Sequence, residues 1–315
     1  RGIYILTFLL VLVLLSFVVF VIYENKNFVQ KSEIFVWSKE TSILINNWFM
    51  MYFLSVVLIG TIYPIFLDVI SSEKISVGPP FYHKLIIPFL IPFLLMMAIG
   101  PKLKWIKSRL NDKIYLILLL LGSILLAFLI LKNFNQNFLI NTILISSALY
   151  LFFVTIRDFF IRKFENISQN IAHFGFSLLI LSILFNNLFS SEIITNLKVG
   201  ETFDDSKTKI IFESVDQKKE KNYDSIIANF KIQSSDGKKD KLFPELRIYN
   251  QPVIATSEAD IKTTLMSDKF IVINLVQNQD FFNVRYQVKP FMLWIWISVI
   301  LISFGGLISF LQKRL

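Results

Sequence analysis

Seven long apolar runs are separated by polar stretches along the 315-residue chain. Each run is close to the roughly 20 residues that a helix needs to cross about 30 Å of hydrocarbon. We expect membrane-spanning helices near residues 3–23, 43–66, 84–100, 114–132, 138–156, 170–190 and 290–311. The third run is the shortest expected span, and its Pro88 and Pro92 predict a kinked helix whose freed carbonyls are satisfied by neighbouring helices.

One long polar segment, residues 191–289, separates the sixth run from the seventh. Apolar and polar residues alternate in SIIANFKIQ (225–233) and in KFIVINLVQ (269–277), which predicts β-strands. Asp236-Gly237 follows the first of these runs and predicts a turn. The expected fold class is a membrane all-α bundle of about seven transmembrane helices with an inserted β-rich domain.

Charge gives these elements an orientation. Outside segment 191–289 the chain carries 17 Lys and Arg against 8 Asp and Glu, whereas the segment itself carries 15 of each. The basic residues gather in the loops 101–113 and 157–165, while the loops 67–83 and 133–137 together hold a single lysine. Because basic loops remain on the cytoplasmic or matrix side, we expect segment 191–289 to be extracytoplasmic.

Three domains follow from this pattern. Residues 1–190 are expected to form a six-span membrane bundle, and residues 191–289 the extracytoplasmic β-rich domain. Residues 290–315 are expected to form the final transmembrane helix and a short inner tail.

Composition and charge argue against several classes of function. The net charge of +9 is spread over separate loops rather than along one basic stripe with interleaved aromatic residues, so it does not indicate nucleic-acid binding. With no cysteine, the chain has neither a disulfide framework nor a thiolate metal site. Segment 191–289 has no histidine, no serine beside an evident base and no glycine-rich phosphate loop, so it reads as a docking module or as a lid over the helices.

One of the two histidines, His173, lies inside an apolar run, where an ionisable group is costly. It serves either as a hydrogen-bonded packing residue or as a ligand. Ala172 and Gly175 are small enough to let another helix or a flat cofactor approach closely. Helical spacing places Gln169 on the same face as His173, so this face becomes polar toward the inner membrane surface.

The other histidine, His83, lies at the outer start of the third run, whereas His173 lies near the inner surface. At about 1.5 Å per helical residue the two imidazoles are roughly 20 Å apart across the membrane. One haem iron cannot bridge that separation. His173 therefore either binds no haem or shares one with a ligand from outside this chain, and His83 is expected to be an interfacial residue.

Several ordered motifs resemble the CcmF cytochrome c haem lyase family of the bacterial and mitochondrial cytochrome c maturation system. They extend over essentially the whole chain and read SKETSILINN (38–47), GTIYPIFLDV (60–69), KISVGPPFYHK (74–84), GPKLKW (100–105), IAHFG (171–175), LFPELRIYN (242–250), TSEADIKTTLMSDKFIV (256–272) and RYQVKPFMLWIWISVILISFGGLISF (285–310). The chain resembles the C-terminal portion of that family. The family's tryptophan-rich loop and its three other functional histidines belong to a preceding part.

The resemblance implies a function in attaching haem covalently to apocytochrome c. It also implies that His173 is one axial ligand of the iron of a membrane b-type haem, and it assigns no catalytic residue. Trp294 and Trp296 do not match the tryptophan-rich loop and are expected to be interfacial anchors. Gly78, Pro79 and Pro80 form either the mouth of the haem-transfer site or an ordinary turn between spans.

Partners implied by the resemblance are the missing N-terminal part of the family protein, the haem chaperone CcmE, a CcmH-type thiol subunit, apocytochrome c and membrane lipid. The implied location is the bacterial inner membrane, or alternatively the mitochondrial inner membrane. A transporter or haem exporter with His173 as a substrate or proton site is the main rival, although no internal repeat supports it. A cofactor-free structural subunit is the second rival.

Overall fold

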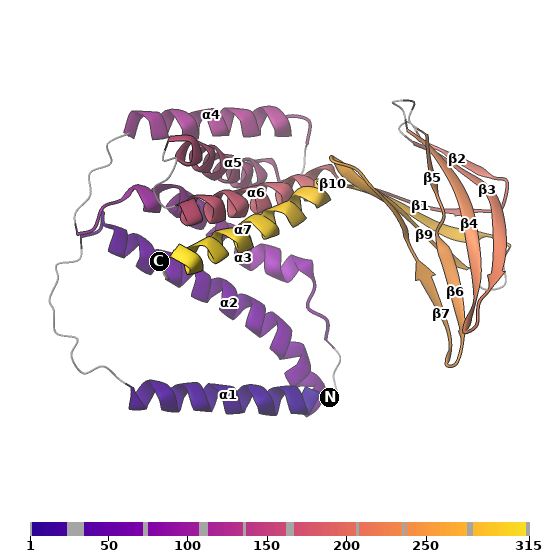
Figure 1. Ribbon diagram of the computed structural model, residues 1–315, viewed down its shortest axis with the longest axis horizontal. Coiled ribbons are helices and arrows are strands. Elements are labelled where there is room, and N and C mark those ends of the chain that lie inside the picture. The colour runs from indigo at the N-terminus through magenta and orange to yellow at the C-terminus, as the bar shows by residue number, and fades with distance from the viewer. Residues whose placement is uncertain are drawn as a thin grey trace. The chain divides into compact units, whose positions relative to one another are not determined.

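The computed structural model describes most of the chain, and its helices and strands are shown in Figure 1. The described residues are 2–23, 35–71, 75–106, 113–134, 137–161, 167–205, 208–234, 237, 239–275 and 280–312. Parts of the predicted inner loops and inner tail, and Asp236 of the predicted turn, lie outside them.

Seven helices among the described residues are long and apolar enough to cross a membrane. They are α1 (Gly2–Ile22), α2 (Lys39–Ile70), α3 (Pro79–Ile99), α4 (Lys113–Leu131), α5 (Phe138–Ile161), α6 (Ile167–Phe189) and α7 (Met292–Gln312). The expected fold class, seven apolar helices with an inserted β domain, is confirmed. The expectation that the third span is the shortest is wrong, because α3 has 21 residues and α4 has 19.

Two helices begin before their apolar runs for local reasons. Ser38 caps the start of α2, where its Oγ accepts a hydrogen bond from the backbone N–H of Thr41 at 3.2 Å. Pro79 and Pro80 occupy the first two positions of α3, where a helix needs no N–H donor from them. Helix α3 then continues through Pro88 and Pro92.

The chain divides into two compact units, Arg1–Ile161 and Arg162–Leu315. In the first unit α4 and α3 both pack against α5, and α2 packs against α3. A short 3₁₀ helix, η1 (Gly100–Lys102), follows α3 and carries Lys102, whose Nζ lies 2.7 Å from Oδ2 of Asp158 on α5. Both side chains of this ion pair are largely buried.

The second unit contains α6, α7 and, among the described residues between them, ten strands. These are β1 (Ser191–Leu197), β2 (Thr202–Asp204), β3 (Thr208–Lys219), β4 (Tyr223–Ser234), β5 (Lys239–Leu242), β6 (Glu245–Asn250), β7 (Val253–Glu258), β8 (Asp260–Thr263), β9 (Ser267–Leu275) and β10 (Phe282–Pro290). The predicted strands 225–233 and 269–277 correspond to β4 and β9. Gly237, in the predicted turn after β4, has a φ of +78°.

The strands form two antiparallel sheets. One has the order β1-β10-β9-β8 and the other β2-β3-β4-β6-β7, with β5 paired to β4. Inward-facing apolar residues of both sheets make one core, in which the rings of Phe212 and Phe230 stack at 4.4 Å. Its fully buried side chains include Ile210, Phe212, Phe230, Ile232, Leu242, Ile271, Ile273 and Tyr286.

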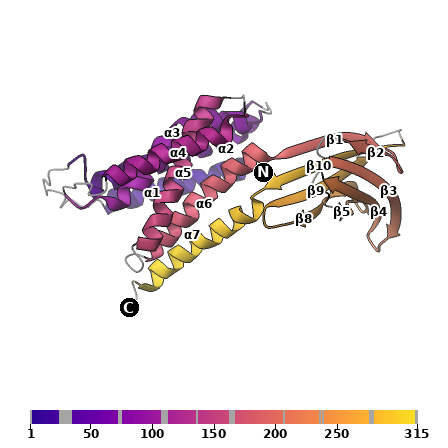
Figure 2. The ribbon, with the colours of Figure 1, turned by 90° about the horizontal axis from the view of Figure 1, so that it is seen from above.

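The sandwich is joined to its two helices by single residues. Ser190 links α6 to β1, and Phe291 links β10 to α7. The strands β1 and β10 pair directly with each other, starting with Ser191 opposite Val288. Figure 2 shows α6 and α7 lying side by side and continuing into these two neighbouring strands. The side-chain Nδ2 of Asn186 on α6 also donates to the carbonyl of Pro290, at 2.6 Å.

Candidate functional site

His173 lies on α6 and is half-buried. With 3.6 residues per turn, Gln169, Phe176 and Ile180 lie on the same face of the helix as this histidine. All three are also half-buried. The predicted face, polar at Gln169 and apolar beyond the imidazole, is therefore present on a continuous helix.

Helix α7 packs against a different face of α6 at very short range. A Cβ added to Gly175 on α6 would lie 3.0 Å from the backbone nitrogen of Ile302. A Cβ added to Gly305 on α7 would lie 2.8 Å from the backbone nitrogen of Ala172 and from the carbonyl oxygen of Ser168. The two backbones therefore meet at glycines, which is a common way for helices to associate in membranes.

The sequence left open whether another helix or a flat cofactor packs against Ala172 and Gly175, and the structure shows a helix there. The face that carries them is occupied by α7 rather than left open for a flat cofactor. His173 follows Ala172 by one residue, so it is rotated about 100° away from it around the helix axis. The close contact with α7 thus sets the direction in which the imidazole projects from the helix pair.

The other predicted site residues lie in the first compact unit. His83 is exposed at the start of the second turn of α3. Gly78 is the N-cap residue of that helix, and Pro79 and Pro80 are its first two residues. These three residues therefore have a local role in starting α3, and their role at the mouth of a haem site stays a prediction.

The two tryptophans expected to be anchors lie in the first turns of α7. The indole Nε1 of Trp294 donates to the carbonyl oxygen of Leu265 at 2.9 Å, in the turn between β8 and β9. Trp296 is 62% exposed. Trp294 therefore connects the sandwich to the last helix, an interaction that the sequence did not indicate.

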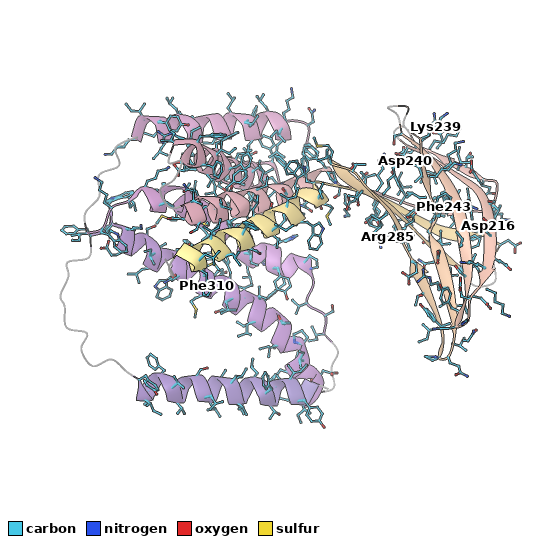
Figure 3. All side chains as sticks on the ribbon, viewed as in Figure 1. Asp216, Lys239, Asp240, Phe243, Arg285 and Phe310 are labelled. Atoms are coloured by element: carbon cyan, nitrogen blue, oxygen red, sulfur yellow. The ribbon has the colours of Figure 1, made fainter. Side chains whose placement is uncertain are left out.

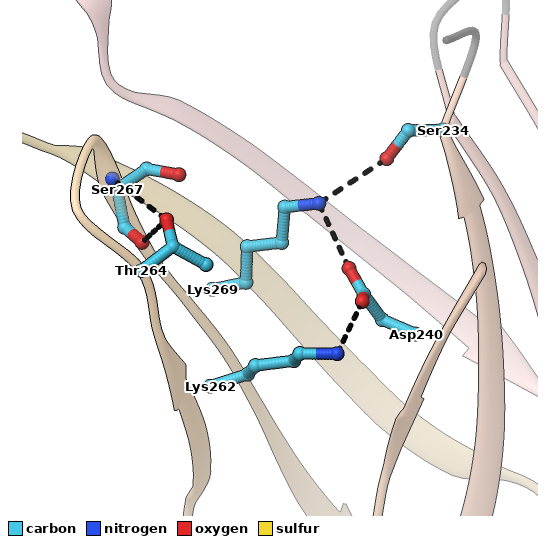
Figure 4. A network of polar contacts seen from close by, with 6 residues as sticks. All are labelled: Ser234, Asp240, Lys262, Thr264, Ser267 and Lys269. Carbon is cyan, nitrogen blue, oxygen red and sulfur yellow. Dashed lines mark hydrogen bonds and ion pairs between the residues drawn. The ribbon is translucent and has the colours of Figure 1, made fainter. Parts of the chain in front are cut away.

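Charged side chains of the sandwich form a network between its two sheets, shown in Figure 4. The carboxylate of Asp240 on β5 accepts hydrogen bonds from Lys262 Nζ at 2.6 Å and from Lys269 Nζ at 2.8 Å. These two lysines hold the pKa of Asp240 below its usual value. Burial, with the charge of Asp240 nearby, raises the pKa of Tyr286 to about 12.

No described part of the sandwich carries a recognisable catalytic arrangement. The described residues hold no group of three or more His, Cys, Asp or Glu side chains that could bind a metal ion. Three of the charged residues labelled on the strands in Figure 3, Asp216, Asp240 and Arg285, make polar contacts within a sheet or between the two sheets. The expectation of a docking module or lid therefore stays a prediction.

Sequence reasoning missed Gly305. The signal was present in the Gly305-Gly306 pair of α7, because small residues mark close helix contacts in membranes. Only the structure distinguishes the two glycines, since a Cβ added to Gly306 would meet nothing within 4 Å.

Comparisons with known proteins agree with this architecture. A family model described as the CcmF C-terminal beta-sandwich matches residues 188–290. The cytochrome c-type biogenesis protein CcmF of Pseudomonas fluorescens is 29% identical over 333 aligned positions, which cover all of this chain and 49% of that protein. CcmF of Escherichia coli K12 is 25% identical, over all of this chain and 50% of that protein.

A solved structure named Cytochrome c Heme Lyase CcmF has the same fold, with a TM-score of 0.66 and 21% identity. The match covers 87% of this chain and 46% of that one. The chain thus spans about half the length of the relatives it matches. With its seven apolar helices and its matching β-sandwich, the chain is similar over its whole length to the C-terminal portion of CcmF cytochrome c-type biogenesis proteins.

Proposed function

We propose that this chain is the C-terminal part of a cytochrome c haem lyase and that His173 is one axial ligand of a membrane b-type haem. The observation that carries the assignment is the position of His173 on α6, half-buried and rotated by about 100° from Ala172, which contacts α7. The family relationship supplies the link to cytochrome c biogenesis.

The residues around His173 fit one side of a haem. A neutral imidazole binds iron through one ring nitrogen, while a hydrogen bond to the other nitrogen orients the ring. Phe176 and Ile180, on the same face, would contact the apolar surface of a porphyrin, and Gln169 would supply a polar group toward one helix end. When bound, a haem of this kind supplies one-electron transfer.

The close contact between α6 and α7 would hold the ligand in place. Rotation of α6 about its axis would turn Gly175 and Ala172 away from α7 and bring larger side chains against its backbone, so the direction of His173 is restricted. A pre-oriented ligand loses less conformational entropy when it binds the iron.

The chain holds one histidine in this position, so the second axial ligand would come from the N-terminal part of the family protein. From the similarity to CcmF, the chain would lie in a bacterial or mitochondrial inner membrane, and the charge of its loops would put the sandwich on the outer side. There the sandwich would meet the haem chaperone CcmE, the CcmH-type thiol subunit and apocytochrome c.

The test is His173→Ala in the chain co-produced with the N-terminal part of the family. We expect loss of the low-spin b-haem absorption of the purified complex and loss of haem-stained cytochrome c. His83→Ala is the matched control, since it removes the chain's other histidine, which is exposed near the start of α3. His83→Ala should leave the absorption unchanged.

A second variant separates ligation from folding. In His173→Gly the side chain is removed, and free imidazole added to the membranes should restore the b-haem absorption if iron ligation was what was lost. An unchanged absorption spectrum in His173→Ala would contradict the ligand assignment. A low-spin haem spectrum from this chain alone would show that the second ligand does not require the N-terminal part.

A further inference from the structure

The turn between β8 and β9 carries two exposed apolar side chains beside the start of a membrane helix. Leu265 and Met266 are each 65% exposed. Tight turns ordinarily carry Gly, Asn, Asp, Ser or Pro, so two large apolar residues at a tip need a reason. The flanking residues Thr264 and Ser267 are polar.

The turn is closed by its own polar groups. The backbone N–H of Thr264 donates to the carbonyl of Ser267 at 3.0 Å, and the N–H of Ser267 donates to Oγ1 of Thr264 at 3.1 Å. Figure 4 shows the Thr264 and Ser267 side of this closure. The two apolar side chains between them are thus held at the tip of a rigid turn.

Helix α7 and the linking residue before it hold the tip through the carbonyl groups of Leu265 and Met266. The indole of Trp294 donates to the carbonyl of Leu265 at 2.9 Å, and the backbone N–H of Phe291 donates to the carbonyl of Met266 at 2.9 Å. Trp294 is the third residue of α7, so the tip lies within about one helical turn of the start of the span. Tryptophan at a helix end is typical of the membrane–water interface.

We propose that Leu265 and Met266 insert into the lipid leaflet on the side of the sandwich, so that the β domain rests on the membrane through this tip as well as through its two helices. The occupant is lipid because the tip is continuous with a span that lipid surrounds. The tip carbonyls already accept hydrogen bonds, so their desolvation is compensated.

This insertion is independent of which side of the membrane the sandwich faces and of whether His173 binds haem. It depends only on α7 crossing the membrane. The absence of cysteine makes it directly measurable, because a single introduced cysteine carries the only thiol of the chain.

The experiment labels Leu265→Cys, and separately Met266→Cys, with an environment-sensitive fluorophore in the full chain. Each labelled chain is reconstituted into phosphatidylcholine vesicles with or without brominated acyl chains. We expect blue-shifted emission at both positions and quenching by the brominated lipid. Neither substitution removes a hydrogen bond described above, because the backbone carbonyls are retained.

Val199→Cys is the matched control. Val199 is also an exposed apolar residue in a tight turn, closed by the N–H of Glu201 donating to the carbonyl of Lys198. It follows β1, whose seven residues lead away from α6 over about 20 Å. Its label should show aqueous emission and no quenching.

Two results would overturn the proposal. Aqueous emission without quenching at both 265 and 266 would show that the tip stays in water. Blue-shifted emission without quenching at both positions would show that protein rather than lipid covers the tip.

Discussion

The sandwich core and the α6–α7 contact hold one compact unit together in opposite ways. The sandwich buries large side chains, such as Phe212 and Phe230, each at most 1% exposed. The helix pair meets at Gly175 and Gly305, where a single added carbon would lie 2.8 to 3.0 Å from neighbouring atoms.

The difference follows from the two solvents. Water drives apolar surface of the sandwich inward, so bulk in the core is stabilising. Lipid is as apolar as leucine and provides no such drive, so helices gain by letting their backbones approach. The same change of residue size should therefore have opposite signs in the two regions: loss of bulk damages the sandwich, and gain of bulk damages the helix pair.

The largest effect is expected from Phe212→Ala. Removal of a fully buried ring leaves a cavity between the sheets, so the free energy of unfolding of the sandwich should fall by about 3–5 kcal/mol. Hydrogen exchange of the β4 and β9 amides in the full chain measures this loss. Phe243→Ala is the control, because Phe243 is 47% exposed, and its effect should be within about 0.5 kcal/mol. Equal losses in the two variants would mean that bulk in the core is not what stabilises the sandwich.

An intermediate effect is expected from Gly305→Ala. The added methyl group meets the backbone of Ala172 and Ser168, which cannot move aside as a side chain can. The free energy of unfolding should therefore fall by about 1–3 kcal/mol. Thermal unfolding of the full chain in detergent micelles measures the change.

Its neighbour provides the matched control. Gly306→Ala adds the same methyl group where nothing lies within 4 Å, so stability should be unchanged or slightly raised. If both variants unfolded at the same temperature as the unmodified chain, backbone contact would not be what holds α6 to α7.

The smallest effect is expected from Asp240→Asn, which tests the ionic part of the sandwich. The substitution leaves Lys269 largely buried without its carboxylate partner, whereas Lys262 is about half exposed and can be solvated by water. The free energy of unfolding of the sandwich should therefore fall by about 1–2 kcal/mol at neutral pH. Hydrogen exchange of the β5, β8 and β9 amides gives the magnitude.

The pH dependence has a definite sign. The pKa of Asp240 is lowered in the folded state. The ionised carboxylate therefore contributes its full stabilisation above the unfolded-state pKa of about 3.9, and this stabilisation is lost as the pH falls through the folded-state pKa. Asp240→Asn should therefore flatten the acid limb of the stability curve. An unaltered acid limb would assign the acid sensitivity to other carboxylates.

The spans were predictable because apolar runs of span length are unusual in water, but their ends were not. Helix α2 begins at Lys39 rather than near residue 43, and α3 at Pro79 rather than near 84. A hydropathy pattern reports only where apolar side chains lie. Ser38 starts α2 by accepting a backbone hydrogen bond, and Pro79 starts α3 through its fixed φ angle, so neither start shows in hydropathy.

The sandwich was less predictable than the spans. The alternation in β4 and β9 predicted a β domain. The pairing of β1 with β10, however, joins residues 85 to 97 positions apart, and no local sequence pattern indicates it. At the candidate site, His173 stood out because ionisable groups are rare in spans. Its supporting contact did not, because Gly305 and Gly306 are indistinguishable until α6 is in place.

The single-residue links at Ser190 and Phe291 have a consequence for how the chain is made. A ribosome delivers β1 immediately after α6, but β10, the strand that β1 pairs with, only just before α7. The four-stranded sheet therefore cannot close until the last span is about to enter the bilayer. We expect closure of the sandwich and insertion of α7 to be coupled in biogenesis. Until then β1 is an unpaired edge strand.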